Sequence, residues 1–303
     1  MKQELSPFFQ QSDEVARALE SSHPVVALES TVITHGLPYP QNLDIALDME
    51  SEVRMQGVIP ATIAVLDGKI RIGLGKEDLQ RLSQAREMHK LSVGDLSTAV
   101  AKRWSGGTTV AGSIFAAARV GIRIFATGGI GGVHRGEDYD ISADMSQLAK
   151  TPIIVVCAGA KAILDLPATL EYLETNSVPI VGYQTDEFPA FFSRSSGLKI
   201  NVSAISVLEI AEIANVHWKL GLNSSVLVVN PPTQDYSMNF EQVEEVVDTA
   251  LADAGRLGIK GKQVTPYLLK RVSELTSGAS LKVNLELLRS NASLAARIAK
   301  ELE

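Results

Sequence analysis

Short segments rich in Val, Ile and Leu alternate along this chain with amphipathic segments that have helical spacing. The alternation continues without a linker, a repeat or a break in composition. Buried strands that alternate with helices are typical of α/β proteins. We therefore predict a single-domain α/β/α layered fold with a largely parallel central sheet over residues 23–303, the catalytic domain, preceded by a weakly packed helical arm over residues 1–22. Within the domain, Asp67-Gly68 predicts the turn of a hairpin over Ala61–Leu74, and Asn42 is expected to cap a helix.

Charge and cysteine content exclude several classes of protein. The net charge of −7 argues against a nucleic-acid partner bound through a general positive field, but a local basic pocket for one phosphate is compatible with it. The only cysteine, Cys157, lies in a predicted buried strand, so no disulfide framework is possible and a reducing, cytoplasmic location is expected. The longest apolar runs are too short to cross a bilayer, and the first twenty residues lack the layout of a signal peptide, so we expect no membrane partner.

The stretch Ile153–Leu164 contains the strongest candidate for a catalytic residue, Lys161. It predicts a buried strand that passes through Ala158-Gly159-Ala160 into Lys161, which is expected to begin a helix. Open α/β sheets bind their ligands just past the carboxyl ends of their strands. Little in the surrounding sequence can solvate an ammonium, and desolvation lowers a lysine pKa and makes the amine a better nucleophile toward a carbonyl carbon. Lys161 is therefore either a Schiff-base lysine or a first-turn lysine whose head reaches water.

Polar and glycine-rich segments follow two other predicted strands. Glu29 comes directly after the strand Val25–Leu28, either as a functional carboxylate or as a solvated turn residue. The run from Gly128 to Gly136, after the strand over residues 122–126, holds five glycines in nine residues. We attribute that density to a backbone that closely approaches a ligand and not to packing. Its spacing does not match the dinucleotide fingerprint, so no NAD site is inferred, but His134 and Arg135 could bind an anion.

Three weaker signals add to these. Glycines and hydroxyls at residues 106–109 precede a predicted helix over Val110–Val120, where backbone N–H groups can bind an anion. Asp140 and Asp144 could cap a helix or hold a hard divalent ion. Lys90 follows a predicted helix over residues 76–89, a position typical of a solvated lysine.

These residues lie in strings that resemble the signatures of the pseudouridine-5′-phosphate glycosidase family. The strings are Ala27–Thr31, Asn42, Gly107–Val110, Ala126–Gly136, Asp140–Asp144, Cys157–Lys161, Gly182–Thr185, Pro189–Phe192, Thr265–Leu269 and Ser280–Asn284. The resemblance runs in order from about residue 24 to the end of the chain and does not cover the first twenty or so residues.

The resemblance implies reversible hydrolysis of the C–C glycosidic bond of pseudouridine 5′-phosphate, which gives uracil and ribose 5-phosphate. It implies that Lys161 is the nucleophile that forms a Schiff base with ring-opened ribose, and that Glu29 is the proton donor. It implies a Mn²⁺ ion, or another divalent cation such as Mg²⁺, at Asp140, and assembly as a homotrimer. The implied substrate-binding residues are Lys90, Thr109, Val110, His134, Ser142, Ala143, Asp144 and Asn284.

The reaction explains why a lysine is needed. A C–C glycosidic bond lacks the heteroatom leaving group of ordinary glycosides, so the two-carboxylate scheme of O-glycosidases is insufficient. A lysine nitrogen bonded to C1′ can form an iminium as the C1′–C5 bond breaks, and protonation of uracil C5 makes uracil a feasible leaving group. Two alternatives stay open. One is a Schiff-base aldolase or lyase acting on another sugar phosphate, and the other is a non-catalytic sugar-phosphate-binding regulator, which would not need Lys161.

Overall fold

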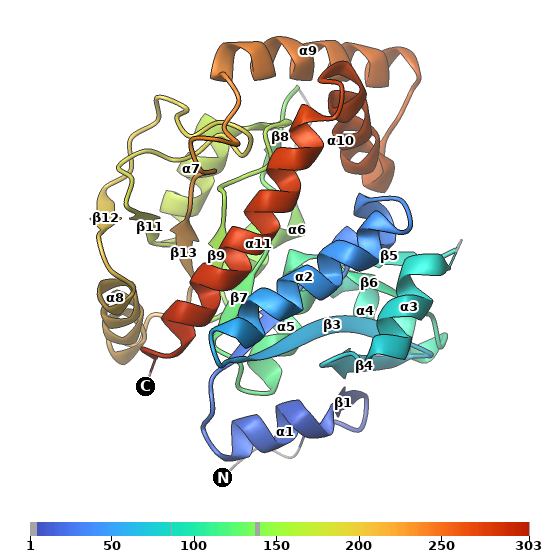
Figure 1. The fold of residues 1–303 in the computed structure, drawn as a ribbon, viewed down its shortest axis with the longest axis vertical. Helices are drawn as coiled ribbons and strands as arrows, with labels where there is room; N and C mark the ends of the chain where they lie inside the picture. The colour runs from blue at the N-terminus through green and yellow to red at the C-terminus, as the bar shows by residue number, and fades with distance from the viewer. Residues whose placement is uncertain (1–4, 86, 137–139, 303) are drawn as a thin grey trace.

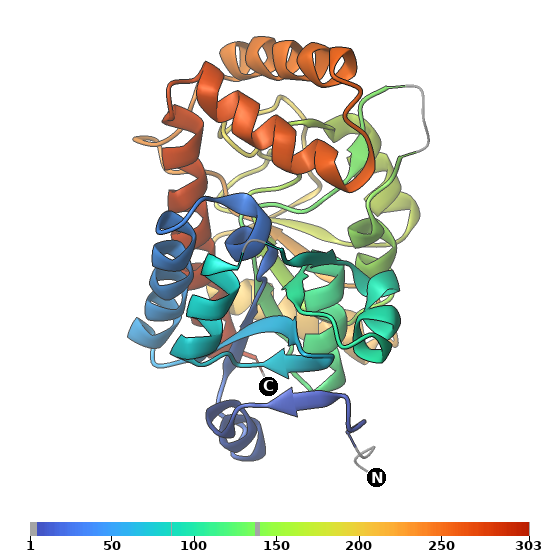
Figure 2. The ribbon, with the colours of Figure 1, turned by 90° about the vertical axis from the view of Figure 1, so that its right-hand side faces the viewer.

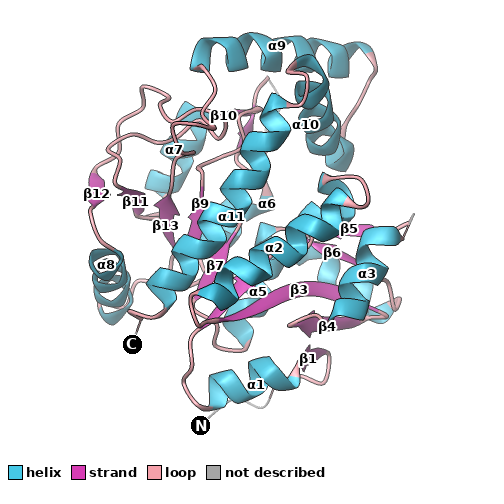
Figure 3. Cartoon of the chain, in the orientation of Figure 1, coloured by secondary structure: helices cyan, strands magenta, loops and turns pink. Residues whose placement is uncertain are grey.

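In the computed structural model, which describes residues 5–85, 87–136 and 140–302, eleven strands form one sheet with helices on both faces (Figures 1 and 3). The order along the sheet is β1-β4-β3-β2-β7-β9-β13-β11-β12, with β6 paired to β3 and β5 paired to β6. The strands of this sheet are β1 (Phe9–Gln11), β2 (Val25–Leu28), β3 (Ile59–Leu66), β4 (Lys69–Ile72), β5 (His89–Leu91), β6 (Gly106–Thr108), β7 (Ile124–Ala126), β9 (Ile154–Cys157), β11 (Ile180–Tyr183), β12 (Val202–Ala204) and β13 (Val226–Val229). The short strands β8 (Val133–His134) and β10 (Leu164–Asp165) form a separate antiparallel pair.

Most neighbouring strands run parallel, as predicted. All pairs from β3 through β2, β7, β9, β13 and β11 to β12 are parallel. Among the described strands of this sheet, antiparallel pairing occurs where β3 meets β4 and β6. The predicted hairpin is confirmed: Asp67 and Gly68 take φ values of 51° and 76° between β3 and β4.

The helices come largely from the amphipathic segments, and Figures 1 and 3 show α2 and α11 crossing one face of the sheet side by side. They are α1 (Asp13–Glu20), α2 (Gln41–Met55), α3 (Lys76–Gln84), α4 (Leu96–Ala101), α5 (Val110–Arg119), α6 (Ala143–Leu148), α7 (Leu166–Thr175), α8 (Val207–Lys219), α9 (Phe240–Arg256), α10 (Val264–Leu275) and α11 (Ala279–Ala299). A π-helical turn, η1 (Val32–Gly36), follows β2. No helix within the described ranges is long and apolar enough to cross a membrane.

Alternate side chains of the central strands supply two cores. In β2, Val25 and Ala27 belong to the cluster that contains residues of α5, α6 and α7, whereas Val26 and Leu28 belong to the cluster that contains residues of α2, α8 and α11. Successive side chains of a strand point to opposite faces, so a strand covered on both sides is apolar throughout. This arrangement confirms the α/β/α layers.

The expected weak packing of the N-terminal segment is wrong for its described part. β1 pairs in parallel with β4, and Val15 of α1 is fully buried in the main core. The reason is that α1 is amphipathic and packs against β2 and β3, while β1 pairs with β4 at the edge of the sheet. Asn42 is also not a helix cap. α2 begins at Gln41, and the Asn42 amide donates to the carbonyls of Ile33 (2.8 Å) and Ser83 (2.9 Å).

Figures 1 and 2 show α9 and α10 together at one end of the molecule, with α1 at the opposite end. The carboxyl ends of the parallel strands point toward the end that carries α9 and α10. We refer to α9, the short 3-10 turn η3 (Gly261–Gln263) and α10 as the cap.

Candidate active site at the carboxyl edge of the sheet

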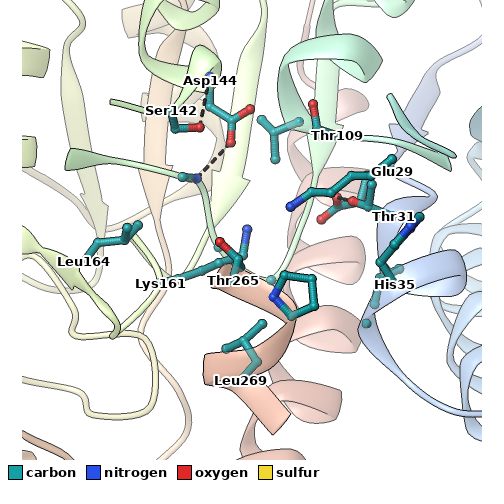
Figure 4. A pocket seen from close by; sticks show the side chains of 18 of the residues that line it. Glu29, Thr31, His35, Thr109, Ser142, Asp144, Lys161, Leu164, Thr265 and Leu269 are labelled. Carbon is teal, nitrogen blue, oxygen red and sulfur yellow. Dashed lines mark hydrogen bonds between the residues drawn. The ribbon is translucent and has the colours of Figure 1, made fainter. Parts of the chain in front are cut away.

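A cavity of about 350 Å³ lies between the strand ends and the cap. Its wall contains all eleven residues to which the family resemblance assigns a role, and these come from segments spread over most of the chain. They are Glu29, Lys90, Thr109, Val110, His134, Asp140, Ser142, Ala143, Asp144, Lys161 and Asn284. Figure 4 shows the side chains of part of this wall. The shared location is an observation, whereas the role of each residue stays a prediction.

Glu29 is held in place by two hydroxyl groups. It follows β2 and is only 7 % exposed. The Thr31 hydroxyl donates to its Oε2, and the Thr127 hydroxyl, which follows β7, donates to its Oε1. Since β2 and β7 are neighbours in the sheet, the parallel pairing itself brings these groups together. Because both of its oxygens accept hydrogen bonds, the Glu29 carboxylate is held in one orientation relative to the cavity.

Lys161 lies in a turn and not at the start of a helix, which corrects the prediction. After β9 the chain bends at Gly159 (φ 80°), and the Lys161 N–H donates to the Ile130 carbonyl (3.1 Å). The helix is delayed because Leu164 and Asp165 first pair with β8. α7 begins at Leu166, where the Asp165 side chain accepts from the Ala168 N–H (2.9 Å). The Lys161 side chain is half-buried and projects into the cavity (Figure 4).

Lys90 also differs from the prediction. α3 ends at Gln84, and Lys90 lies in β5, where it pairs in register with Gly107 of β6. It is half-buried and lines the cavity. Its pairing with a glycine places no side chain beside it on the neighbouring strand.

Two histidines stand near these lysines. Burial lowers the pKa of His35, and the positive charge of Lys90 lowers it further. Burial also lowers the pKa of His134, an effect that the carboxylate of Asp140 opposes and that Lys90 and Lys161 reinforce. Both imidazoles are therefore held toward their neutral form, and the positive charge near His134 comes from the two lysines.

The N-terminus of α5 does hold an anion, and that anion is a side chain of the protein. Asp144 is 5 % exposed, and its two oxygens accept from the N–H groups of Ala111 and Gly131, each at 2.8 Å. Ser142 caps α6 by accepting from the Asp144 N–H (3.2 Å), and Thr109 caps α5. The carboxylate of Asp144 therefore joins the start of α5 to the glycine-rich loop.

The glycine-rich loop is closely packed. The prediction that its glycines serve the approach of a ligand and not packing is therefore wrong for part of the loop. A Cβ atom on Gly129 would lie 2.6 Å from the ring of Phe191, and one on Gly131 would lie 2.2 Å from Ser142 Oγ. Packing therefore forbids a side chain at these positions. Gly128 also faces Asn284 of α11, so the loop, α11 and the cavity meet there.

Arg135 does not line this cavity, so its predicted role in binding an anion there is wrong. Its guanidinium lies on the far side of the Lys161 turn and contacts α9. The reason is the pairing of β8 with β10, in which His134 lies opposite Leu164. Arg135, the next residue, therefore lies beside the segment that follows Lys161.

Several other lining residues were given no individual role from the sequence. Of these, Thr31, Phe191, Thr265 and Leu269 lie in strings that carry the family resemblance, whereas His35 does not. Thr31 also carried a local signal, because it follows β2 as closely as Glu29 does. The position of Thr265 and Leu269 in the cavity wall carried no local signal, because only the fold brings α10 over the strand ends.

The fold and the cavity define an α/β protein with a small-molecule site at the carboxyl edge of a parallel sheet. The chain belongs to the family described as indigoidine synthase A like protein, whose model matches residues 14–301.

Similar proteins cover nearly the whole chain. A protein of Solibacter usitatus named pseudouridine-5′-phosphate glycosidase is 53 % identical over 292 residues, 96 % of this chain and 98 % of that protein. One of the same name from Caldanaerobacter subterraneus is 48 % identical over 300 residues, 98 % of each chain. These matches confirm the resemblance stated from the sequence.

Two solved structures share the fold. A crystal structure of an indigoidine synthase A-like protein from Thermotoga maritima has a TM-score of 0.86 at 36 % identity and covers 91 % of this chain and 92 % of that one. The prealnumycin C-glycosynthase AlnA, solved in complex with ribulose 5-phosphate, has a TM-score of 0.90 at 38 % identity and covers 98 % and 97 %.

Proposed function

We propose that this protein reversibly hydrolyses the C–C glycosidic bond of pseudouridine 5′-phosphate to uracil and ribose 5-phosphate. The observation that carries the proposal is the convergence of Glu29, Lys90 and Lys161 on one cavity. Relatives at 48–53 % identity bear the name of this activity, and AlnA, named a C-glycosynthase, was solved with a pentose phosphate. Its name supports the reversible character of the chemistry.

Lys161 is the proposed nucleophile. Its amine bonds to C1′ of the ribose as the C1′–O4′ bond breaks and O4′ takes up a proton, which opens the ring. The lysine nitrogen then carries a lone pair next to the bond that must break. The half-buried turn after β9 holds the amine at the cavity.

Glu29 is the proposed proton donor. It gives a proton to uracil C5, the lysine nitrogen forms a double bond to C1′, and the electron pair of the C1′–C5 bond stays with uracil. Water then adds to C1′ and releases ribose 5-phosphate from the lysine. The grip of Thr31 and Thr127 suits a general acid, which must stay within hydrogen-bond reach of the atom that it protonates.

Lys90 is the proposed phosphate anchor. Its ammonium is a compact charge, and Lys90 lines the cavity together with Thr109, whose N–H donates to the carbonyl of the neighbouring Leu91 (2.9 Å) at the start of α5. Since the start of α5 already holds the Asp144 carboxylate, we assign the attraction of the phosphate mainly to Lys90.

A divalent metal ion, Mn²⁺ or Mg²⁺, is part of the proposal, with Asp140 as its protein ligand. Among the described residues there is no group of three or more His, Cys, Asp or Glu side chains that could hold a metal alone. A single carboxylate with waters and substrate oxygens nevertheless fits Mg²⁺ and Mn²⁺, which commonly bind in this way. A bound ion would order water and substrate oxygens around the reacting sugar or base.

The metal assignment is tested by chelation. Exhaustive chelation of the wild type should abolish turnover, and added Mn²⁺ should restore it. Asp140→Ala should lose both the response to Mn²⁺ and the electron paramagnetic resonance signal of bound Mn²⁺, while its melting temperature without metal is unchanged. Full activity after chelation would contradict the assignment.

A homotrimeric assembly and a cytoplasmic location complete the proposal and rest on the sequence resemblance and composition. Sedimentation of the purified protein tests the first, and fractionation of cells tests the second.

The function itself is tested by ultraviolet detection of uracil released from pseudouridine 5′-phosphate. Release of uracil with equimolar ribose 5-phosphate is expected. Glu29→Gln, which keeps the shape and can still bind both threonines, is the matched control and should be inactive. Cleavage of another sugar phosphate without uracil release would favour a Schiff-base aldolase or lyase, and binding without any turnover would favour a regulator.

A further inference from the structure

Arg135 contacts two parts of the molecule at once. Its Nη2 donates to the Ala162 carbonyl (3.1 Å) and its Nε to the Leu164 carbonyl (3.2 Å). The same guanidinium forms ion pairs with Glu244 (2.7 Å) and Asp248 (3.3 Å) of α9. The side chain is 23 % exposed, so these contacts use most of its surface.

The two hydrogen bonds to backbone carbonyls hold the segment that directly follows Lys161. On its inner side this turn is fixed by the Lys161 N–H, which donates to Ile130, and by the Leu164 N–H, which donates back to the Lys161 carbonyl (3.0 Å). Arg135 binds the next carbonyls on the outer side. The turn that carries the amine is therefore clamped between the glycine-rich loop and a planar guanidinium.

The second pair of contacts reaches the cap. α9 is joined to α10 through the buried carboxylate of Asp253, which accepts from Arg271 (2.8 Å). α10 in turn places Thr265, Pro266 and Leu269 in the cavity wall. Arg135 thus connects the Lys161 turn to the helices that cover the opposite side of the cavity.

We infer that Arg135 is a positioning residue for the nucleophile, which fixes the Lys161 turn relative to the cap without touching substrate. The expected effect on the rate of uracil release rests on the proposed function, in which Lys161 attacks C1′. A lysine at position 135 keeps one positive charge for Glu244, but its single ammonium cannot span two carbonyls and two carboxylates in the plane of a guanidinium.

The first test compares Arg135→Lys with the wild type. We expect kcat for uracil release to fall at least tenfold with KM within threefold, because a displaced nucleophile impairs bond formation more than ground-state binding. The rate at which borohydride traps ribose 5-phosphate on Lys161 should fall by a similar factor. Arg54→Lys is the matched control, since Arg54 makes a bidentate ion pair with Glu14 at the opposite end of the molecule and should leave all rates unchanged.

The second test needs no substrate. Hydrogen exchange at the amides of Lys161 and Leu164 should be at least tenfold faster in Arg135→Lys, with the exchange of β2 and β7 unchanged. This measurement separates the two proposals: if the wild type released no uracil, the proposed function would fail, yet the exchange result would still decide whether Arg135 holds the turn.

The link to the cap is tested by Glu244→Gln. We expect a smaller loss of kcat than in Arg135→Lys, and the double variant should lose no more than Arg135→Lys alone. Losses that multiply, a wild-type kcat in Arg135→Lys, or faster exchange spread over the whole sheet would each overturn the inference.

Discussion

Replacing Asp144 with Asn should destabilise the protein even when no substrate is present. The carboxylate accepts two backbone hydrogen bonds of 2.8 Å, at the N-terminus of α5 and at Gly131, and is nearly fully buried. Asn can accept at one of these N–H groups but must turn its own NH₂ toward the other. The substitution therefore weakens one charge-assisted hydrogen bond, leaves one buried N–H without an acceptor and removes a favourable charge at a helix N-terminus, each worth about 1 kcal/mol or somewhat more.

The expected loss in the free energy of unfolding is therefore about 3 kcal/mol. With an unfolding entropy of about 2.1 cal/mol/K per residue, or about 0.6 kcal/mol/K for the 303 residues, the melting temperature should fall by about 5 °C. Differential scanning calorimetry of the ligand-free protein, supported by urea titration, measures both quantities. Asp165→Asn is the matched control, because Asn replaces Asp at a helix N-cap at a cost of well under 1 kcal/mol.

An unchanged melting temperature in Asp144→Asn would refute the reasoning. That result would mean that Asp144 serves the substrate alone and that the two backbone contacts carry little energy. A large loss in both Asp144→Asn and Asp165→Asn would point to the loss of charge in general and not to the paired N–H contacts.

Other substitutions and reagents probe the proposed chemistry. Lys161→Ala and Lys161→Arg should both abolish uracil release with little change in melting temperature, because the side chain is half-exposed and a guanidinium stays protonated. A borohydride adduct of ribose 5-phosphate on a different lysine would contradict the mechanism. Lys90→Ala should raise KM tenfold or more with a smaller change in kcat, since an anchor binds ground and transition states alike, and unphosphorylated pseudouridine should be a poor substrate for the wild type. Burial raises the pKa of the Cys157 thiol to about 12, so iodoacetamide at pH 8 should label this cysteine only after unfolding, as mass spectrometry will show.

Much of this architecture could be predicted from local patterns. The strand Val25–Leu28 and the Asp67-Gly68 turn were predictable because burial on both faces and paired positive φ values leave clear traces in a sequence. Lys161 was correctly expected past a strand end, but its turn was mistaken for a helix because the pairing of β10 with β8 is a contact between distant segments. β1 was missed for the same reason, since its three residues become a strand only through the edge of β4.

The composition of the cavity was predictable mainly where the residues follow strands or lie in the glycine-rich loop. Glu29 and Lys161 stand at carboxyl ends of parallel strands, where sites collect. The string Thr265–Leu269 belongs to the family resemblance, but its place in the cavity wall was not predictable from a local pattern, because it lies on an ordinary amphipathic helix whose position depends on tertiary packing. Asp144 was identified, but its engagement with two backbone N–H groups follows from the distance between α5 and the glycine-rich loop, which no local pattern encodes.

The position of α11 has a consequence for how the protein is made. α11 packs on β2, β7 and β9, contributes Asn284 to the cavity, and through Asn291 donates to the Thr127 carbonyl (2.8 Å). Every strand that the structure describes precedes it in the sequence. A ribosome that has translated residues 1–278 has therefore supplied the whole sheet but not the helix that shields one of its apolar faces. Until α11 has been translated, that apolar face stays uncovered, and exposed apolar surface of this kind promotes aggregation. The cavity, which needs Asn284 of α11 in its wall, is complete only once α11 has packed on the sheet.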